Sequence, residues 1–232
     1  MGHVIAVTAV FLATHLAFAE APLRGWSVRL LGEKPFAYAY SAIAILQLIW
    51  LGSVIDTAPV VVYWRPPEWA PIIPLAIMPL ALLLLVCGFS QNNPTATLAP
   101  DVAKRRKVVG ILAITRNPVM WGLGLWSLAH LPVATEAVQA LRFAAFAGLA
   151  LLGVQRIERK QHAKWGDAAW RDFIARSSNL PFLAMLQGRA KLNWREIGWT
   201  RLAFTAAFYV AIVFWFHPVV IGAPVWSMAV GP

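Results

Sequence analysis

Residues 72–89 read IIPLAIMPLALLLLVCGF and carry no charged side chain. A helix needs about 20 apolar residues to cross about 30 Å of hydrocarbon, and this run comes close to that length. Inside lipid, the backbone N–H and C=O groups must pair within their own segment. The run is therefore predicted to be a transmembrane helix.

Runs of the same kind occur on both sides of it. The predicted spans cover residues 4–19, 36–55, 72–89, 108–131, 137–153 and 202–220. Of the whole chain, 59% of the residues are hydrophobic and 13% are charged, against about 25% charged in a soluble domain. We predict an all-α polytopic bundle of about six transmembrane helices in a lipid bilayer, built as one domain over residues 1–232. The lone Cys87 cannot form an internal disulfide, which excludes a disulfide-framed chain.

Positive charge is concentrated in alternate links between these spans. The formal net charge is +10, and most Lys and Arg residues fall within 24–34, 104–107 and 156–201. Such links stay in the cytoplasm, so the pattern predicts an integral protein of a bacterial inner membrane with both termini in the periplasm. The same reasoning explains the basic charge without a nucleic acid partner.

The segment from about residue 155 to residue 200 is polar, basic and dotted with tryptophan. These properties predict one or two amphipathic helices that lie on the cytoplasmic membrane face. Lys and Arg there would face anionic lipid, at about 1 kcal/mol each.

Two histidines, His15 and His130, are embedded in apolar runs. An ionisable side chain within a span is costly and usually faces the bundle interior. Each could be a neutral imidazole bonded to a neighbouring helix, for example through Thr14 or Ser127. Alternatively, the two could ligate one metal, as axial ligands of haem iron. Their expected depths in the membrane differ by roughly 12 Å at 1.5 Å per residue, which a tilted helix would reduce.

A second group of candidate residues begins with TRNPVMWG at 115–122. Pro118 suits the first turn of a helix, and Asn117 suits the position before it. Arg116, Asn117 and Glu158 would share the cytoplasmic side with SSNLPF at 177–182, and together could bind an anionic cofactor. The alternative is a shelf for lipid headgroups plus helix caps.

The order of these motifs resembles the NnrU family of bacterial membrane proteins. The matching pieces are His15 with Pro22 and Arg24, GEK at 32–34, TRNPVMWG at 115–122, LWSLAHL at 125–131, SSNLPF at 177–182 and Gly188-Arg189. The likeness covers almost the whole chain. It implies a role in denitrification or nitric oxide metabolism.

Two related groups suggest chemistry. The 15-cis-zeta-carotene isomerase is similar to NnrU proteins and is a haem b protein with membrane histidines, a likeness that falls on His15 and His130. The isoprenylcysteine carboxyl methyltransferases bind S-adenosylmethionine with an Arg-His-Pro motif and an acidic segment. That likeness falls on Arg116, Pro118, Gly122 and Glu158. Asn117 stands where that motif has histidine, and residues 131–136 lack the usual Asn-Gly-Asp.

Three functions are compatible with the sequence. The first is a haem b membrane protein with an isomerase or redox role on a hydrophobic substrate such as a polyene. It would use His15 and His130 as iron ligands. The second is an S-adenosylmethionine-dependent methyltransferase of a lipidic substrate, with Arg116, Asn117 and Glu158 at the cofactor. The third is a non-catalytic accessory subunit that docks to another membrane complex.

Overall fold

The computed structural model describes residues 1–19, 21–91, 93–95, 107–223 and 225. Within these residues every named element is helical, and the only strand-like pairing is an antiparallel bridge between Val62 and Glu136. The predicted all-α membrane bundle is thus confirmed. The basic positions Lys104, Arg105 and Arg106, which contributed to the predicted orientation, lie outside the described residues.

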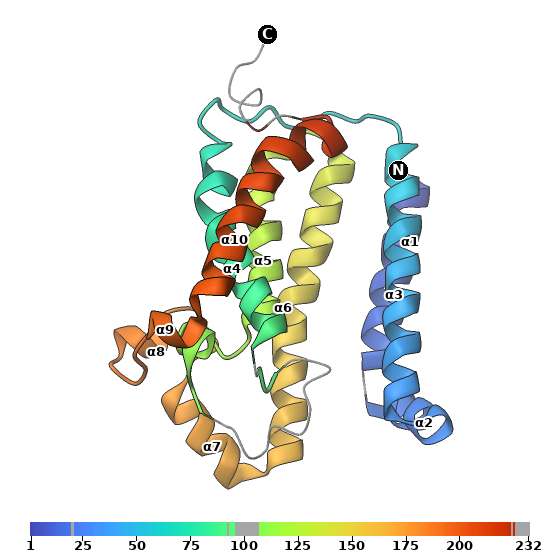
Figure 1. Cartoon of the computed structure of the whole chain (residues 1–232). Coiled ribbons are helices and arrows are strands. Elements are labelled where there is room, and N and C mark those ends of the chain that lie inside the picture. Colours follow the sequence, from blue (N-terminus) through green and yellow to red (C-terminus); the bar gives the residue numbers. More distant parts are fainter. Residues whose placement is uncertain (20, 92, 96–106, 224, 226–232) are drawn as a thin grey trace. The chain divides into compact units, whose positions relative to one another are not determined.

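Five helices in the described part are long and apolar enough to cross a membrane (Figure 1). They are α1 (Gly2–Ala19), α3 (Glu33–Asp56), α4 (Ile72–Ser90), α6 (Ala137–Trp165) and α10 (Trp199–Ala211), which continues as a π-helix over Ile212–Ile221. They coincide with five of the predicted spans. A chain with these helices is an integral membrane protein whose environment is a lipid bilayer.

The predicted span over residues 108–131 is divided. A 3₁₀ turn, Gly110–Ala113, comes first, and α5 (Pro118–His130) follows with 13 residues. At 1.5 Å per residue α5 is about 20 Å long, short of the about 30 Å of hydrocarbon. The physical reason is Pro118, which lacks an N–H group and drives Asn117 out of the helical region.

The link before α6 nevertheless lies beside the link after α3. The Tyr63 N–H donates to the Thr135 carbonyl at 3.1 Å, and the Ala137 N–H donates to the Val61 carbonyl at 2.9 Å. Within the first unit, the start of α6 and the end of α3 therefore lie at the same end.

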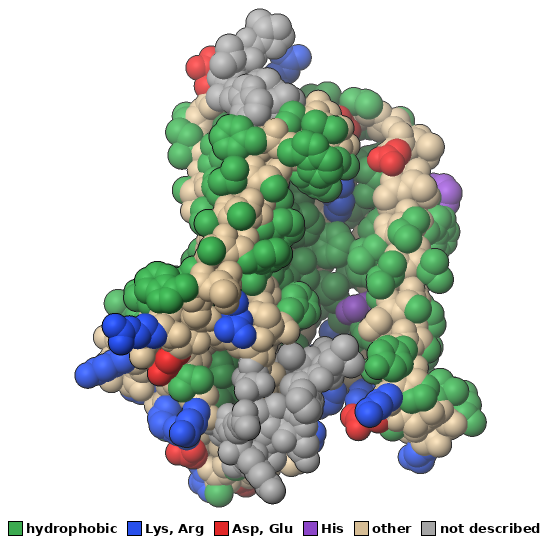
Figure 2. Space-filling model, in the orientation of Figure 1, with side chains coloured by type: hydrophobic (Ala, Val, Ile, Leu, Met, Phe, Trp, Pro, Cys, Tyr) green, Lys and Arg blue, Asp and Glu red, His purple; other side chains and the backbone are tan. Residues whose placement is uncertain are grey.

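The predicted amphipathic segment is helical only in parts. α6 runs on to Trp165, and three short helices follow: α7 (Asp167–Arg176), α8 (Leu183–Leu186) and α9 (Trp194–Ile197). α7 buries Trp170 and Phe173 on one face. Figure 2 shows Lys and Arg side chains gathered about α8 and α9, while hydrophobic side chains cover the neighbouring helix surface.

The chain forms two compact units. The first unit comprises Met1–Arg65 and Ala134–Ala145, and contains α1, α2 (Ala21–Leu31), α3 and the start of α6. The second comprises Pro66–Val133 and Phe146–Pro232, and contains the remaining helices. Each has its own core. That of the first is built from Val4, Val7, Leu51, Val54 and Val138, and that of the second from Leu83, Leu84, Cys87, Ile111, Leu112, Ile114 and Ile197.

Helices α4 and α5 pack closely because a glycine lies at their contact. A Cβ atom on Gly122 would stand 2.7 Å from Leu85 Cγ and 2.8 Å from the Ala81 carbonyl oxygen. Small residues at such a position let two backbones approach within a membrane. This contact positions the N-terminus of α5, where the candidate polar residues lie.

Candidate functional site

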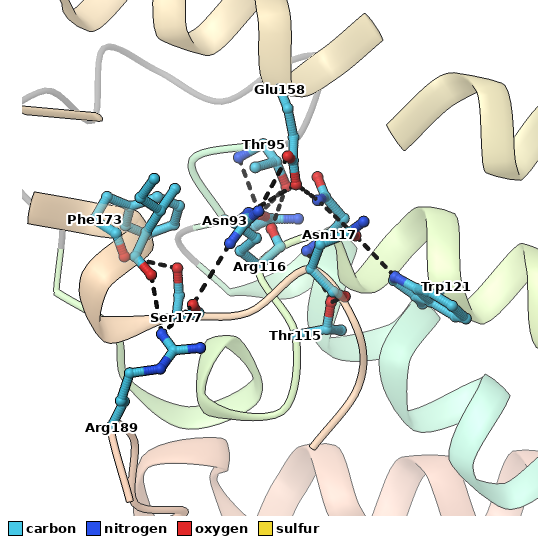
Figure 3. Close-up of polar contacts among 12 residues, drawn as sticks. Asn93, Thr95, Thr115, Arg116, Asn117, Trp121, Glu158, Phe173, Ser177 and Arg189 are labelled. Atoms are coloured by element: carbon cyan, nitrogen blue, oxygen red, sulfur yellow. Dashed lines mark hydrogen bonds and ion pairs between the residues drawn. The ribbon is translucent and has the colours of Figure 1, made fainter. Parts of the chain in front are cut away.

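The three polar residues predicted to share a site do meet, in the second unit (Figure 3). Arg116 Nε donates to Glu158 Oε1 at 2.7 Å, and Arg116 Nη2 donates to Glu158 Oε2 at 3.1 Å. Asn117 Nδ2 donates to Glu158 Oε1 at 2.7 Å. The pair is bidentate and largely shielded, with side-chain exposures of 13% for Arg116 and 21% for Glu158.

Asn179 and Thr115 complete this polar cluster, and both stand in the two motifs that were expected to share a polar pocket. Asn179 Oδ1 accepts from Asn117 Nδ2 at 3.2 Å and from Trp121 Nε1 at 3.0 Å. Thr115 Oγ1 donates to the Asn179 carbonyl at 2.6 Å. Asn179 belongs to the SSNLPF motif, so the sequence indicated that this segment contributes to the polar site. Only packing shows that the Asn179 side chain reaches the start of α5.

The backbone around Arg116 is held by neighbours on both sides. Its N–H donates to the Ser178 carbonyl at 2.8 Å, and its carbonyl accepts from Thr95 Oγ1 at 2.8 Å. Its guanidinium lies 5.7 Å from the centre of the Trp170 ring, within cation–π range. The Arg116 side chain therefore has one fixed position, facing Glu158 on α6.

Asn117 occupies the position before α5, as expected, but its side chain does not cap the helix. The amide group points instead to Glu158 and Asn179. The residue is 1% exposed, and its Oδ1 atom is buried without a hydrogen-bond partner. Turning the amide over would bring Oδ1 against the Glu158 carboxylate, so the observed orientation is the favourable one. A buried acceptor of this kind costs about 1–3 kcal/mol.

His15 lies in the first unit, on α1. Its ring centre is 5.1 Å from that of Tyr40 and 5.5 Å from that of Phe11. The Nδ1 atom is buried and has no hydrogen-bond partner. Tyr40 Oη donates to the His15 carbonyl at 3.1 Å, which ties α3 to α1 beside the ring. Thr14 does not bond the imidazole, because its hydroxyl pairs with Gln47 and with backbone carbonyls.

A cavity of about 210 Å³ opens beside His15 within the first unit. Its lining comes from α1, α2 and α3, and includes Trp26, Phe36, Tyr40 and Ile43. Apart from the imidazole and a few hydroxyl and amide groups, the wall is apolar. It can hold a hydrophobic ligand with one group that coordinates or hydrogen-bonds to His15.

His130 is the last residue of α5, in the second unit. Its Nδ1 atom lies 2.7 Å from the Trp126 carbonyl oxygen. A carbonyl only accepts, so Nδ1 carries the proton and Nε2 is the acceptor nitrogen. The ring centre is 6.4 Å from that of His217, with 18° between the planes. The Ser127 hydroxyl donates to the Leu123 carbonyl instead of to this histidine.

His15 and His130 thus have separate surroundings, each within its own unit. No group of three or more His, Cys, Asp or Glu side chains suited to a metal occurs among the residues that the structure describes.

Comparison with known protein families gives a match over nearly the whole chain. The family model described as NnrU protein covers residues 3–225. The chain belongs to the NnrU family. No curated protein matches the chain, and no solved structure matches it.

The NnrU match includes both units, so the polar cluster and the two histidines all lie in the region that defines the family. Within this NnrU protein, the two sites differ in what they can do. The Glu158 carboxylate is neutralised by Arg116, and the pair joins the start of α5 to α6. His15, in contrast, presents an imidazole beside a cavity, which is the arrangement that a ligand requires.

Proposed function

We propose that this NnrU protein is a haem b membrane protein with an isomerase or redox role on a hydrophobic substrate such as a polyene. His15 and His130 would hold the iron. The proposal is carried by one observation: His15 lines an apolar cavity, and its buried Nδ1 atom has no hydrogen-bond partner.

The chemistry of His15 supports this assignment. With no acceptor near Nδ1, the favoured neutral tautomer places the proton on Nε2 and leaves a lone pair on Nδ1. A buried nitrogen without a partner costs about 1–3 kcal/mol, and coordination to iron would remove that cost. Trp26 and Phe36 in the cavity wall offer flat apolar surface to a macrocycle.

The surroundings of His130 support its use as the second ligand. Metal-binding histidines commonly donate the other ring N–H to a carbonyl, which fixes the tautomer and the orientation of the ring. The hydrogen bond from Nδ1 to the Trp126 carbonyl, at 2.7 Å, is of this kind. Iron would then bind at Nε2. The haem would supply an iron centre able to take up electrons or bind nitric oxide, which is the basis for a role in denitrification.

An absorption spectrum tests the proposal. Protein purified in detergent from cells supplied with a haem precursor should show a Soret band, and His15→Ala and His130→Ala should each shift or abolish it. His162→Ala is the matched control, because His162 pairs with Asp167 and is 46% exposed. A colourless protein, or three variants with the spectrum of the parent, would exclude this ligand pair.

A second candidate function rests on the polar cluster. The buried Asn117 Oδ1 atom could accept from an amino group, and Glu158 stands next to it. S-adenosylmethionine carries such donors, which supports a membrane methyltransferase acting on a lipidic substrate.

Calorimetry with S-adenosylmethionine tests this candidate. Binding should be detectable at millimolar cofactor and should weaken at least about tenfold in Glu158→Gln, which removes a charged acceptor. Glu68→Gln, at an exposed carboxylate of the α3–α4 link, should bind like the parent. No heat of binding to the folded parent protein would rule the methyltransferase out.

A further inference from the structure

A second cavity of about 620 Å³ lies in the second unit and opens widely to the surface. Arg116, Arg171 and Arg189 line it together with residues 177–180. It adjoins the polar cluster through Arg116 and Asn179, and the functions proposed above assign no role to Arg171, Arg189 or Ser178. Its lining combines guanidinium groups, serine hydroxyls and leucine side chains.

Two of the three arginines have no acidic partner among the described residues. Arg116 is neutralised by Glu158. Arg171 makes no hydrogen bond or ion pair with any described residue. Arg189 donates only to neutral groups: the carbonyls of Ile174, Ala175 and Ser177, at 2.8–3.0 Å, and the Gln187 side chain.

The position of Arg189 also changes the electrostatic effect that the C-terminal end of α7 has on an anion. The C-terminal carbonyls of a helix carry partial negative charge and repel anions. Here three carbonyls at or just past the end of α7 accept hydrogen bonds from the Arg189 Nη1 atom. The charge of the arginine therefore outweighs the helix end, and the cavity is electropositive.

Ser178 adds an unused polar group. The residue is 4% exposed and lines the cavity. Its carbonyl accepts from the Arg116 N–H, but its hydroxyl has no hydrogen-bond partner in the part of the chain that the structure describes. The hydroxyl is therefore available to donate to an acceptor oxygen of a ligand in the cavity.

The rim of the cavity is apolar and exposed. This property favours a lipid over a free anion as the ligand. Leu180 lines the cavity and is 52% exposed, and Leu183, on α8, lines it as well. Between them Phe182 has a left-handed backbone with a φ of 66°, and its N–H donates to the Ile114 carbonyl at 2.8 Å. A non-glycine residue in this conformation stores strain, and such strain is often found at ligand-binding turns. Leucines beside arginines match an acyl chain joined to an anionic headgroup.

We propose that this cavity binds the phosphate group of an anionic phospholipid. Arg171, Arg189 and the Ser178 hydroxyl donate to the phosphate oxygens, and the acyl chains lie along Leu180 and Leu183. The site is independent of haem and of S-adenosylmethionine. It is a specific site, distinct from the general attraction of basic residues to an anionic membrane surface.

Native mass spectrometry of the detergent-purified protein with dioctanoyl-phosphatidylglycerol tests the proposal. Phosphatidylglycerol should bind with a definite stoichiometry. Arg171→Gln and Ser178→Ala should each weaken it, about tenfold for the arginine, since hydrogen bonds to charged groups are the stronger ones. Arg195→Gln removes the same charge from an exposed position of α9 outside the cavity, and should leave binding within about twofold.

Other outcomes would overturn the proposal. Equal losses in the Arg171 and Arg195 variants would show diffuse attraction only. Inorganic phosphate that displaces the lipid at an equal concentration would assign the cavity to a free anion. A thermal unfolding curve for each variant shows whether it is folded, and Arg171→Lys, which keeps the charge, should retain most of the binding.

Discussion

Glu158 is the residue on which the polar cluster depends. Its carboxylate accepts two hydrogen bonds from Arg116 and one from Asn117. Neither donor has another carboxylate within reach in the cluster. Removing the acceptor leaves a shielded guanidinium and a buried amide without their partner, which costs more than the pair itself contributes.

We predict that Glu158→Ala lowers the free energy of unfolding by about 3 kcal/mol. The control is Glu33→Ala, at a carboxylate that is 76% exposed and pairs with Arg24 at 3.2 Å. An exposed pair contributes at most about 1 kcal/mol, so this variant should unfold almost like the parent. Denaturant unfolding in detergent micelles measures both. Similar losses in the two variants would mean that the cluster is open to water.

Among the elements, α5 shows how a short helix is held within a bundle. It has 13 residues and begins at a proline, so its own hydrogen bonds do not account for its stability. The packing of α5 against α4 does account for it, and at Gly122 there is no room for a side chain between the two helices. The next glycine along, Gly124, has more room, since a Cβ there would stand 3.6 Å from Ala150 Cβ.

These two glycines give a matched pair of substitutions. Gly122→Ala should destabilise the protein by about 1–3 kcal/mol, because the added methyl group overlaps Leu85 and the Ala81 carbonyl. Gly124→Ala should be neutral or stabilising by up to about 1 kcal/mol, because alanine favours a helix over glycine. Thermal unfolding in detergent compares them. A lower stability for Gly124→Ala than for Gly122→Ala would contradict the close packing of α4 and α5.

The last span changes its hydrogen-bond pattern part-way. α10 gives way to a π-helix over Ile212–Ile221, and Pro218 lies inside it. Proline removes one backbone N–H, and a wider turn accommodates its ring. His217 lies in this π-helix and stacks near His130, so the irregular segment brings a second histidine to the end of α5.

At the scale of the whole molecule, the orientation in the membrane is a prediction from the distribution of charge along the links. The bridge between Val62 and Glu136 places the links after α3 and before α6 at one end. The basic residues of α7, α8 and α9 follow the opposite end of α6. From the positive-inside rule we predict that this opposite end of α6 faces the cytoplasm.

Reporter fusions test this topology in the cell. A reporter active only in the periplasm should give signal when it is fused after Pro232 and no signal when it is fused after Lys107. A fusion after Arg65, in the link between α3 and α4, should also give signal, because that link shares an end with the start of α6. The reverse pattern at all three positions would invert the predicted orientation.

The sequence was sufficient for the membrane class, for five of the spans and for the membership of Arg116, Asn117 and Glu158 in one polar group. Whether a run enters lipid depends on the summed transfer free energies of its own residues, which can be counted along the chain. The resemblance to the NnrU family, carried by short motifs in order, also needed no coordinates and is confirmed.

Only the tertiary structure decided how these pieces meet. Arg116 and Glu158 are 42 positions apart and Asn117 and Asn179 are 62 apart, so their contacts depend on how α5, α6 and the 177–182 loop pack. The division of the fourth span, the cavity beside His15 and the basic cavity at Ser178 arise in the same way. A cavity or a buried partner is a property of several segments at once, because burial is set by what neighbouring helices cover. Local sequence patterns do not contain that information.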